Sequence, residues 1–460
     1  MKNETRTKVE YEPAGGSLRP TSALMPFSMK SICSLALLCS SVFTSLLAQT
    51  PELSLVLKAV TDRPDAIYKT GETATFVIEA TRGDKPVADA RITCILSKDG
   101  ILPQPPLPLL LKNGKTTLTG SLAEPGFLQL SVTSEKSSAI ASAAYDPLQI
   151  KPSMPVPDDF DAFWAAQKAA LRKVPVKSTL TPVKTAVKGV DAFDAQIDCL
   201  GAPVSGYFGR PQNAKPKSLP AILFVHGAGV SGSSPGPFSW ALNEGGTLAM
   251  DINAHGIANG KPKEFYDELS KGALKDYRYV GRTDREQNYF KGMFLRLIRA
   301  IDFLTSQPEW DGKTVIVYGS SQGGFQALAA AGLDERVTFI CAGVPAGCDH
   351  TGVTVGRVNG WPKLVPNDAN GKPDAAALQT ARYFDCVNFA QRAKCKGAAV
   401  TVGFIDRTCP PTSVYAAFNA LTASKQMHID TLAGHTNTPE AVKFMQQSAF
   451  KHIREMKKAQ

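Results

Sequence analysis

The chain has 460 residues, of which 43% are hydrophobic and 20% charged, and its formal net charge is +10. These proportions are typical of a globular protein, and the length allows roughly two or three domains. The lysines and arginines are scattered and form no basic stripe interleaved with aromatic residues, which argues against nucleic acid as a partner.

The N-terminus has the pattern of a secretory signal peptide. Lys30 precedes the apolar run 32–48, which is too short and too often interrupted by Ser and Thr for a membrane span. A basic start, an apolar centre and a small residue at the end are typical of a cleaved signal. We therefore expect residues 1–48 to combine an over-extended start, with Met25 or Met29 as the true initiator, and a signal. The mature protein would be secreted or periplasmic, with no membrane association.

Seven cysteines would remain after cleavage, at positions 94, 199, 341, 348, 386, 395 and 409. An odd number leaves at least one thiol free in an exported protein, and the sequence does not determine how the others pair. No Cys-x-x-Cys or Cys/His cluster has zinc-site spacing, so we expect no metal.

Short strands separated by turn residues follow the signal. They are expected at 52–57, 75–80, 90–96, 116–118 and 127–132. This pattern predicts an immunoglobulin-like β-sandwich over residues 50–148, about a hundred residues long. The region has no catalytic constellation. It could bind carbohydrate, but few aromatic residues are available for a sugar platform, which favours a spacer or packing role.

A proline-rich linker at 151–157 leads into a second domain, residues 155–460, in which strands alternate with helices. Strands are expected at 179–187, 193–200, 204–211, 221–225, 247–252, 314–318, 339–344, 399–405 and 428–432, and helices from 158, at 288–307, at 325–331 and at 414–421. This alternation predicts an α/β fold with a doubly wound, mostly parallel sheet.

One strand of that sheet runs directly into Gly319-Ser320-Ser321-Gln322-Gly323-Gly324 and then into an Ala-rich helix. The Gly-x-Ser-x-Gly frame centres on Ser321, and a sharp strand-to-helix turn would expose its hydroxyl above the sheet edge. The helix N-terminus would direct free N–H groups at developing negative charge. Ser321 is therefore the candidate nucleophile, and the alternative is a Gly-rich turn in some other α/β protein.

Two further reactive residues are expected at the same edge, because ligands bind beyond the carboxyl ends of parallel strands. Asp406 follows the strand 399–405, and His435 lies just past the strand 428–432. The order Ser, Asp, His along the chain is that of the α/β-hydrolases. His435 would take the proton of the serine and return it to the leaving alcohol, while Asp406 would orient the imidazole.

Other residues compete for these roles. Asp349 and Asp385 are rival acids, and His350 is a rival site-lining histidine. Asp406 could also cap the helix 414–421, in addition to or instead of orienting a histidine.

Acyl transfer also needs donors for the oxyanion of the tetrahedral intermediate. The backbone N–H of Gln322 is one candidate, and the N–H of Ala228, after His226-Gly227, is the other. No Gly-rich phosphate motif opens the first strand, so we expect no cofactor.

Several segments together carry a family resemblance: Asp159-Phe160-Asp161-Ala162-Phe163-Trp164, His226-Gly227, residues 319–324, Tyr383-Phe384-Asp385, Asn388-Phe389-Ala390, residues 403–411 and Gly434-His435. With them the chain resembles the acetyl xylan esterase / cephalosporin C deacetylase family (carbohydrate esterase family seven) over roughly residues 155–455. The resemblance implies an α/β-hydrolase with a Ser/Asp/His triad that removes small acyl groups, chiefly acetyl, from sugars. The resemblance is also compatible with assembly of the chain into a homo-oligomer.

The chain departs from that family at two places. His255-Gly256-Ile257 stands where the family usually has Arg-Gly-Gln, and Thr436 stands where a Glu usually follows the catalytic histidine. These departures concern the support of the site and its substrate preference, whereas the triad is intact.

The sequence thus predicts an exported serine esterase that deacetylates carbohydrate such as xylan or xylo-oligosaccharides through an acyl-enzyme. The alternatives are a peptidase of the same fold and a catalytically inert glycan-binding protein. A serine-directed fluorophosphonate probe separates an active enzyme from an inert one.

Overall fold

A computed structural model of the chain describes residues 54–101 and 103–458, and the expected signal peptide lies outside these residues. Within them, no helix is both long enough and apolar enough to cross a membrane. The chain contacts place residues 53–460 in one compact unit. The boundary between the domains 50–148 and 155–460 therefore remains a prediction.

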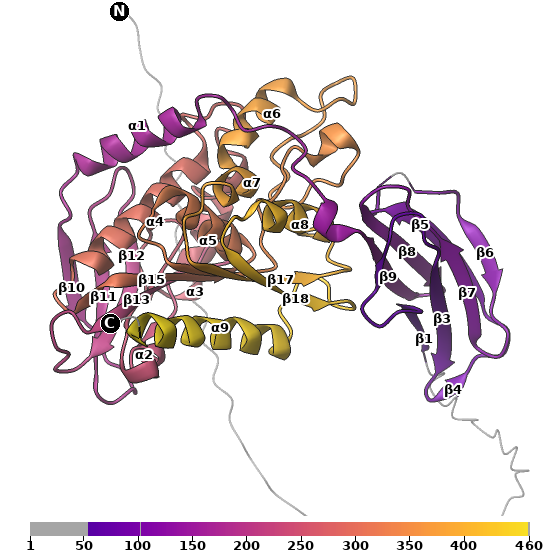
Figure 1. Cartoon of the computed structure of the whole chain (residues 1–460), viewed down its shortest axis with the longest axis horizontal. Helices are drawn as coiled ribbons and strands as arrows, with labels where there is room; N and C mark the ends of the chain where they lie inside the picture. The colour runs from indigo at the N-terminus through magenta and orange to yellow at the C-terminus, as the bar shows by residue number, and fades with distance from the viewer. Residues whose placement is uncertain (1–53, 102, 459–460) are drawn as a thin grey trace, which may run out of the picture. The chain divides into compact units, whose positions relative to one another are not determined.

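The N-terminal β-region contains two sheets, drawn in indigo and purple in Figure 1. One has the order β1-β3-β4, with β7 also paired to β3, and the other has the order β2-β9-β8-β5-β6. The strands are β1 (Leu55–Thr61), β2 (Ile67–Tyr68), β3 (Ala74–Arg82), β4 (Lys85–Pro86), β5 (Arg91–Lys98), β6 (Leu107–Leu110), β7 (Lys115–Gly120), β8 (Gly126–Ser134) and β9 (Ser137–Tyr145). Alternate side chains of both sheets point inward and form one buried cluster, as in a sandwich.

The α/β region is built on a nine-stranded sheet with the order β10-β11-β12-β14-β13-β15-β16-β17-β18. Its strands are β10 (Ser178–Pro182), β11 (Val190–Ile197), β12 (Val204–Pro211), β13 (Leu219–Val225), β14 (Leu248–Ile252), β15 (Trp310–Ser320), β16 (Phe339–Gly343), β17 (Gly397–Gly403) and β18 (Ser424–Asp430). Neighbours from β14 to β18 are parallel, whereas β10, β11 and β12 join by antiparallel pairing. The mostly parallel, doubly wound α/β-hydrolase sheet is thus confirmed.

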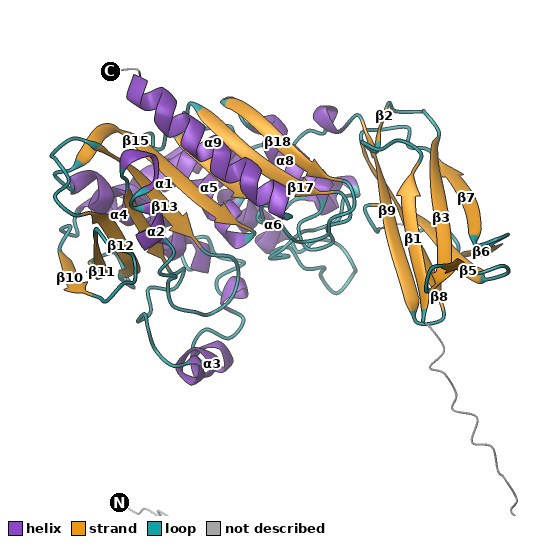
Figure 2. Ribbon diagram, turned by 90° about the horizontal axis from the view of Figure 1, so that it is seen from below, coloured by secondary structure: helices purple, strands orange, loops and turns teal. Residues whose placement is uncertain are grey.

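Helices cover both faces of this sheet. They are α1 (Phe160–Arg172), α2 (Pro237–Trp240), α3 (Lys263–Lys271), α4 (Tyr289–Ser306), α5 (Gln322–Leu333), α6 (Ala375–Ala381), α7 (Cys386–Ala390), α8 (Pro411–Ala420) and α9 (Pro439–Lys458). Because strand side chains alternate between faces, Leu223 packs with the cluster that contains α4 and α5. Its neighbour Ile222 packs with Met445 and Ile453 of α9, the helix that lies along one face of the sheet in Figure 2.

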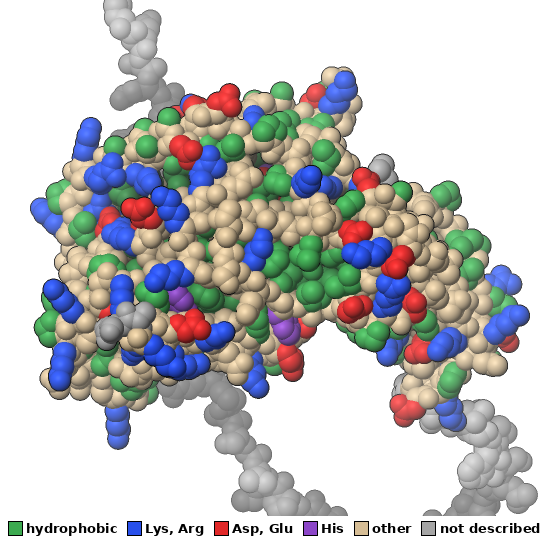
Figure 3. Space-filling model, in the orientation of Figure 1, with side chains coloured by type: hydrophobic (Ala, Val, Ile, Leu, Met, Phe, Trp, Pro, Cys, Tyr) green, Lys and Arg blue, Asp and Glu red, His purple; other side chains and the backbone are tan. Residues whose placement is uncertain are grey.

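The charged surface agrees with the scattered basic residues of the sequence. On the face shown in Figure 3, blue basic side chains are interspersed with red acidic ones.

All seven cysteines in the described part of the chain are free thiols, at positions 94, 199, 341, 348, 386, 395 and 409.

Two glycines let α5 pack tightly against the neighbouring strands. A Cβ at Gly323 would lie 2.3 Å from the backbone oxygen of Val225, and one at Gly319 would lie 2.7 Å from the backbone of Gly323. Both contacts are to backbone, which cannot move aside as the end of a side chain can. The glycines of the predicted motif are therefore required by close packing.

We expect Gly323→Ala to lower the free energy of unfolding by about 1–3 kcal/mol, because the added methyl overpacks a rigid site. Urea denaturation of the purified variant measures this loss. The control is Gly292→Ala in α4, where a Cβ would meet only the Arg296 guanidinium, at the ordinary van der Waals distance of 3.5 Å. It should keep or raise the stability, because alanine favours a helix over glycine by about 1 kcal/mol. Equal losses in both variants would contradict the packing argument.

Candidate active site

The candidate nucleophile lies at the turn between β15 and α5. Ser321 has φ 59° and ψ −120°, a conformation that costs a non-glycine residue about 1–3 kcal/mol. Its N–H donates to the carbonyl of Gly343 at 2.8 Å, and its own carbonyl accepts from the N–H groups of Phe325 and Ala346, each at 3.0 Å. These bonds hold the strained turn, which is the strand-to-helix elbow that the Gly-x-Ser-x-Gly frame predicts.

The structure brings the three candidate catalytic residues together. Ser321 Oγ lies 2.8 Å from His435 Nε2, and His435 Nδ1 lies 2.7 Å from Asp406 Oδ2. The Asp406 side chain is 1% exposed, and its other oxygen, Oδ1, accepts the N–H groups of Thr408 and Cys409 at 2.7 and 2.8 Å. One carboxylate oxygen thus anchors the loop and the other meets the imidazole. This is the geometry of a serine, a base and an orienting acid.

The structure also settles where the rival residues lie. Asp406 bonds the turn ahead of α8, whose N-cap is Pro410, so the idea that it caps that helix is wrong. Asp385 caps α7 and accepts the N–H groups of Asp349 and His350 at 2.8 and 2.7 Å. Burial, and then the charge of Asp349, raise the pKa of Asp385 to about 8. These residues form a buried polar cluster.

His350 belongs to the same cluster and does not line the cavity at Ser321. It is 1% exposed, and burial lowers the pKa of its imidazole to about 3. A histidine that stays neutral in the interior suits packing. His435, in contrast, has a side chain that is 26% exposed and reaches the nucleophile.

Both candidate oxyanion donors lie on segments next to Ser321. Gln322 is the first residue of α5, so its N–H has no acceptor within the helix. The loop that carries Ala228 passes beside the nucleophile, since a Cβ at Gly227 would lie 3.9 Å from the Cβ of Ser321. The geometry is therefore compatible with a pair of backbone donors facing the ester carbonyl.

Three side chains that the sequence did not single out as site residues hold these donor segments. Gln326 Nε2 donates to the carbonyl of His226 at 3.0 Å, and His255 Nε2 lies 2.7 Å from the carbonyl oxygen of Gly229. The Tyr277 hydroxyl donates to Gln322 Oε1 at 2.6 Å. His255 occupies a position where the chain departs from the family that it resembles, and its hydrogen bond to Gly229 holds one end of the donor loop. Its other ring nitrogen, Nδ1, is hydrogen-bonded to the hydroxyl of Tyr289.

A cleft of about 440 Å³ opens at Ser321 and His435. It is lined by Phe224, Val225, His226, Gly227, Asp251, Tyr318, Gly319, Ser320, Ser321, Val344, His435, Thr436 and Asn437. These residues come from the carboxyl ends of several strands and from the loops that follow them. The cleft is therefore where an α/β sheet is expected to bind its ligand.

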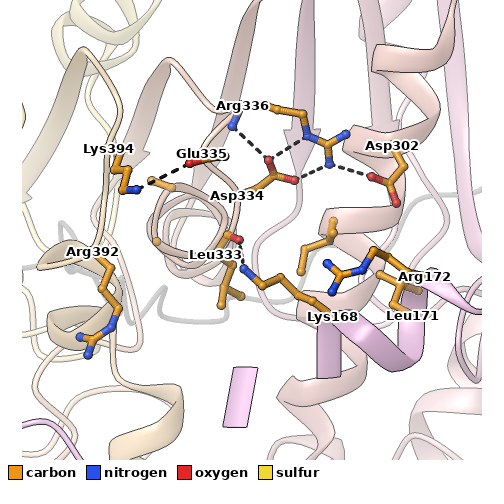
Figure 4. A pocket seen from close by; sticks show the side chains of 13 residues that line it. Lys168, Leu171, Arg172, Asp302, Leu333, Asp334, Glu335, Arg336, Arg392 and Lys394 are labelled. Atoms are coloured by element: carbon orange, nitrogen blue, oxygen red, sulfur yellow. Dashed lines mark hydrogen bonds and ion pairs between the residues drawn. The ribbon is translucent and has the colours of Figure 1, made fainter. Parts of the chain in front are cut away.

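A second cavity, of about 450 Å³, lies at the far end of α5 (Figure 4). Leu333, the last residue of that helix, is twelve residues from Ser321, which corresponds to about 18 Å along the helix axis from the nucleophile. The charged side chains that line this cavity are largely paired. Arg336 contacts Asp334 and Asp302 at 2.6 and 2.7 Å, and Lys168 donates to the carbonyl of Leu333 at 2.9 Å. Since it lies at the opposite edge of the sheet from Ser321, this cavity has no part in the site.

Among the described residues, one group of side chains has metal-like spacing. The ligand atoms of Asp406, Cys409 and His435 all lie within 4.8 Å of one another. A metal would need the Cys409 thiolate, but burial raises the pKa of that thiol well above its usual value. It would also break the hydrogen bond between Asp406 and His435. The arrangement suits the hydrogen-bonded triad better than a metal.

Comparison with known proteins identifies the family of the chain. A family model described as acetyl xylan esterase (AXE1) matches residues 146–455. Acetyl esterase Axe7A of Xylanibacter ruminicola is 31% identical over 389 residues, which is 83% of this chain and 87% of the relative.

Solved structures give the same result. The acetyl xylan esterase from Paenibacillus sp. R4 is 28% identical, with a TM-score of 0.56 over 66% of this chain and 97% of that one. Acetyl xylan esterase 1 from Thermoanaerobacterium sp. is 21% identical, with a TM-score of 0.52 over 65% of this chain and 97% of that one, and supports the fold. The chain belongs to the acetyl xylan esterase family and is a carboxylic ester hydrolase.

Proposed function

We propose that this protein is an exported serine esterase that removes acetyl groups from acetylated carbohydrate, such as xylan or xylo-oligosaccharides. The observation that carries the proposal is the continuous chain of hydrogen bonds from Ser321 Oγ through His435 to Asp406, in a member of this family. The apolar, signal-like run at 32–48 supports export.

The reaction proceeds through an acyl-enzyme. Ser321 Oγ attacks the acetyl carbonyl while His435 Nε2 takes its proton, and Asp406 stabilises the imidazolium that forms. The N–H groups of Gln322 and Ala228 bind the oxyanion. The tetrahedral intermediate then collapses as the ester C–O bond breaks, and His435 returns the proton to the departing sugar oxygen. Water, deprotonated by His435, attacks the acetyl-serine; the bond from Ser321 Oγ to the acyl carbon then breaks, acetate departs, and His435 returns the proton to Ser321 Oγ.

The test is acetate release from p-nitrophenyl acetate and from acetylated xylan by the purified protein. A sample whose serine has been blocked with a fluorophosphonate is the control. We expect turnover of both esters, and loss of both after blocking. Turnover of the aryl ester alone would keep the serine chemistry and remove xylan as the substrate. No serine-dependent turnover of either would overturn the proposal.

A further inference from the structure

We propose that the cleft beside Ser321 contains a carbohydrate subsite in which Asp251 binds a free hydroxyl group of the sugar that carries the acetyl ester. Phe224 and Tyr318 form the floor of this subsite, and His226 fixes the carboxylate. The inference rests on the proposed function, which requires a sugar ester but does not say what holds the sugar.

The floor follows from the register of three neighbouring strands. Phe224 in β13 pairs with Asp251 in β14 on one side and with Tyr318 in β15 on the other. Directly paired residues of adjacent strands point to the same face of a sheet. All three side chains line the same cavity as Ser321 and His435.

The aromatic side chains of the floor are held in place by Trp240 of α2. The Trp240 ring packs against Phe224 and Tyr318, with centroid separations of 5.0 and 5.8 Å. Rigid aromatic rings offer a large contact area at little cost in conformational entropy. The C–H face of a pyranose is apolar and suits such a surface.

Only one carboxylate oxygen of Asp251 is hydrogen-bonded within the described residues. Its Oδ1 accepts the N–H of Ser234 at 3.0 Å and is hydrogen-bonded to His226 Nε2. Its Oδ2 has no hydrogen-bond partner within residues 54–101 and 103–458. The side chain is 9% exposed and lines the cleft, and Oδ2 is not among the fully buried atoms without a partner in the described residues, so it is accessible to a ligand there. A sugar hydroxyl is a neutral donor that fits this acceptor.

Another polar side chain of the cleft is already satisfied. Asn437 Nδ2 donates to Ser320 Oγ at 2.8 Å, and its Oδ1 accepts from the Thr401 hydroxyl at 2.5 Å. The Tyr318 hydroxyl, in contrast, has no partner in the described chain. The cleft groups without a protein partner in the described residues, at Asp251 and Tyr318, therefore flank Phe224 on the same floor.

A purely structural role for Asp251 makes a different prediction. His226 begins the loop that carries Ala228, so Asp251 could serve only to position that loop. Loss of such a support would slow the hydrolysis of every ester alike. A hydroxyl-binding role slows only those esters whose alcohol carries a free neighbouring hydroxyl.

The experiment compares three acetate esters: p-nitrophenyl acetate, a monoacetylated methyl xyloside and the fully acetylated methyl xyloside. In Asp251→Asn we expect kcat/KM for the monoacetate to fall about tenfold or more, mainly through KM, because one hydrogen bond to a charged group is lost. The aryl ester and the fully acetylated sugar, which lack the hydroxyl, should stay within about threefold of the parent. Tyr318→Phe should give a smaller change of the same selectivity.

The matched control is Asp430→Asn. Asp430 also pairs with a histidine, at 3.3 Å from His428 Nε2, but does not line the cleft. Its substitution should leave the ratio between the sugar monoacetate and the aryl ester unchanged. An equal loss on all three esters in Asp251→Asn, or no loss on any, would overturn the subsite. A parent enzyme that cleaves the aryl ester but no xyloside acetate would instead overturn the proposed function, and the subsite with it.

Discussion

Ser321→Ala is expected to reduce kcat by about a million-fold on any ester, because it removes the atom that would attack the carbonyl. The Cβ remains, and the bonds to Gly343, Phe325 and Ala346 that hold the turn are all made by backbone atoms. The variant should therefore fold normally and melt at the temperature of the parent. Initial rates with p-nitrophenyl acetate, together with loss of fluorophosphonate labelling, measure the effect.

The chain offers a matched control one residue away. Ser320 Oγ accepts a hydrogen bond from Asn437 Nδ2 at 2.8 Å, whereas the hydroxyl that meets His435 belongs to Ser321. Ser320→Ala should keep kcat within about tenfold of the parent, since it removes one neutral hydrogen bond. If Ser320→Ala were inactive and Ser321→Ala active, the nucleophile would be misassigned.

The candidate triad residues could be predicted from the sequence because each one lies within five residues of the end of a recognisable strand. Such strands are apolar runs with strong β-propensity, and their carboxyl ends must meet at one edge of a parallel sheet. The structure places Ser321 after β15, Asp406 three residues beyond β17 and His435 five residues beyond β18. Strand-end position, rather than the short motif alone, made these residues identifiable.

The supports of the site could not be predicted in this way. Tyr277 lies between α3 and α4 and is 45 residues from its partner Gln322. His255 and Gln326 bond the carbonyls of a loop from a different strand. Such bonds depend on the path of loops through space, and no local periodicity or turn signal encodes that path.

The fold shows a similar limit. Strand β9 was not singled out, because its sequence SSAIASAAY is rich in Ser and Ala and poor in the β-branched and aromatic residues that mark strands. The strand β10 also ends at Pro182, earlier than the expected 187, and a proline is typical of an edge strand such as this one. Burial against neighbouring strands stabilises β9, whereas β10 is a mostly exposed edge strand.

The β-region and the α/β region are joined by side-chain hydrogen bonds. The described chain therefore forms one compact unit and does not separate into two at the proline-rich linker. Arg407 Nη2 donates to Gln129 Oε1 at 3.1 Å and to Ser131 Oγ at 2.7 Å, and both of these partners lie in β8. The neighbouring residue along the chain is Asp406. The β-region thus contacts the loop that carries the candidate catalytic acid, which is compatible with the packing role favoured for it. The linker composition alone gave no sign of this contact.

Asp406→Asn is expected to lower kcat by about ten-thousand-fold while KM changes little. An asparagine amide turned toward His435 Nδ1 would donate a hydrogen bond there, so the imidazole would adopt the tautomer that cannot take the serine proton. The asparagine oxygen can still accept the N–H groups of Thr408 and Cys409, as Asp406 Oδ1 does. The fold should therefore survive, and the melting temperature should stay within a few degrees of the parent.

The rival acid Asp385 gives the opposite expectation. Its oxygens accept the N–H groups of Asp349, His350 and Val387, and an asparagine in its place would direct an NH₂ group at one of these donors. Asp385→Asn should therefore lower the melting temperature. Its kcat, calculated per active site as counted by fluorophosphonate labelling, should stay within about tenfold of the parent. If instead Asp385→Asn abolished turnover by folded enzyme and Asp406→Asn did not, Asp385 would be the orienting acid. The two isosteric substitutions separate a carboxylate that acts on the imidazole from one that holds the backbone.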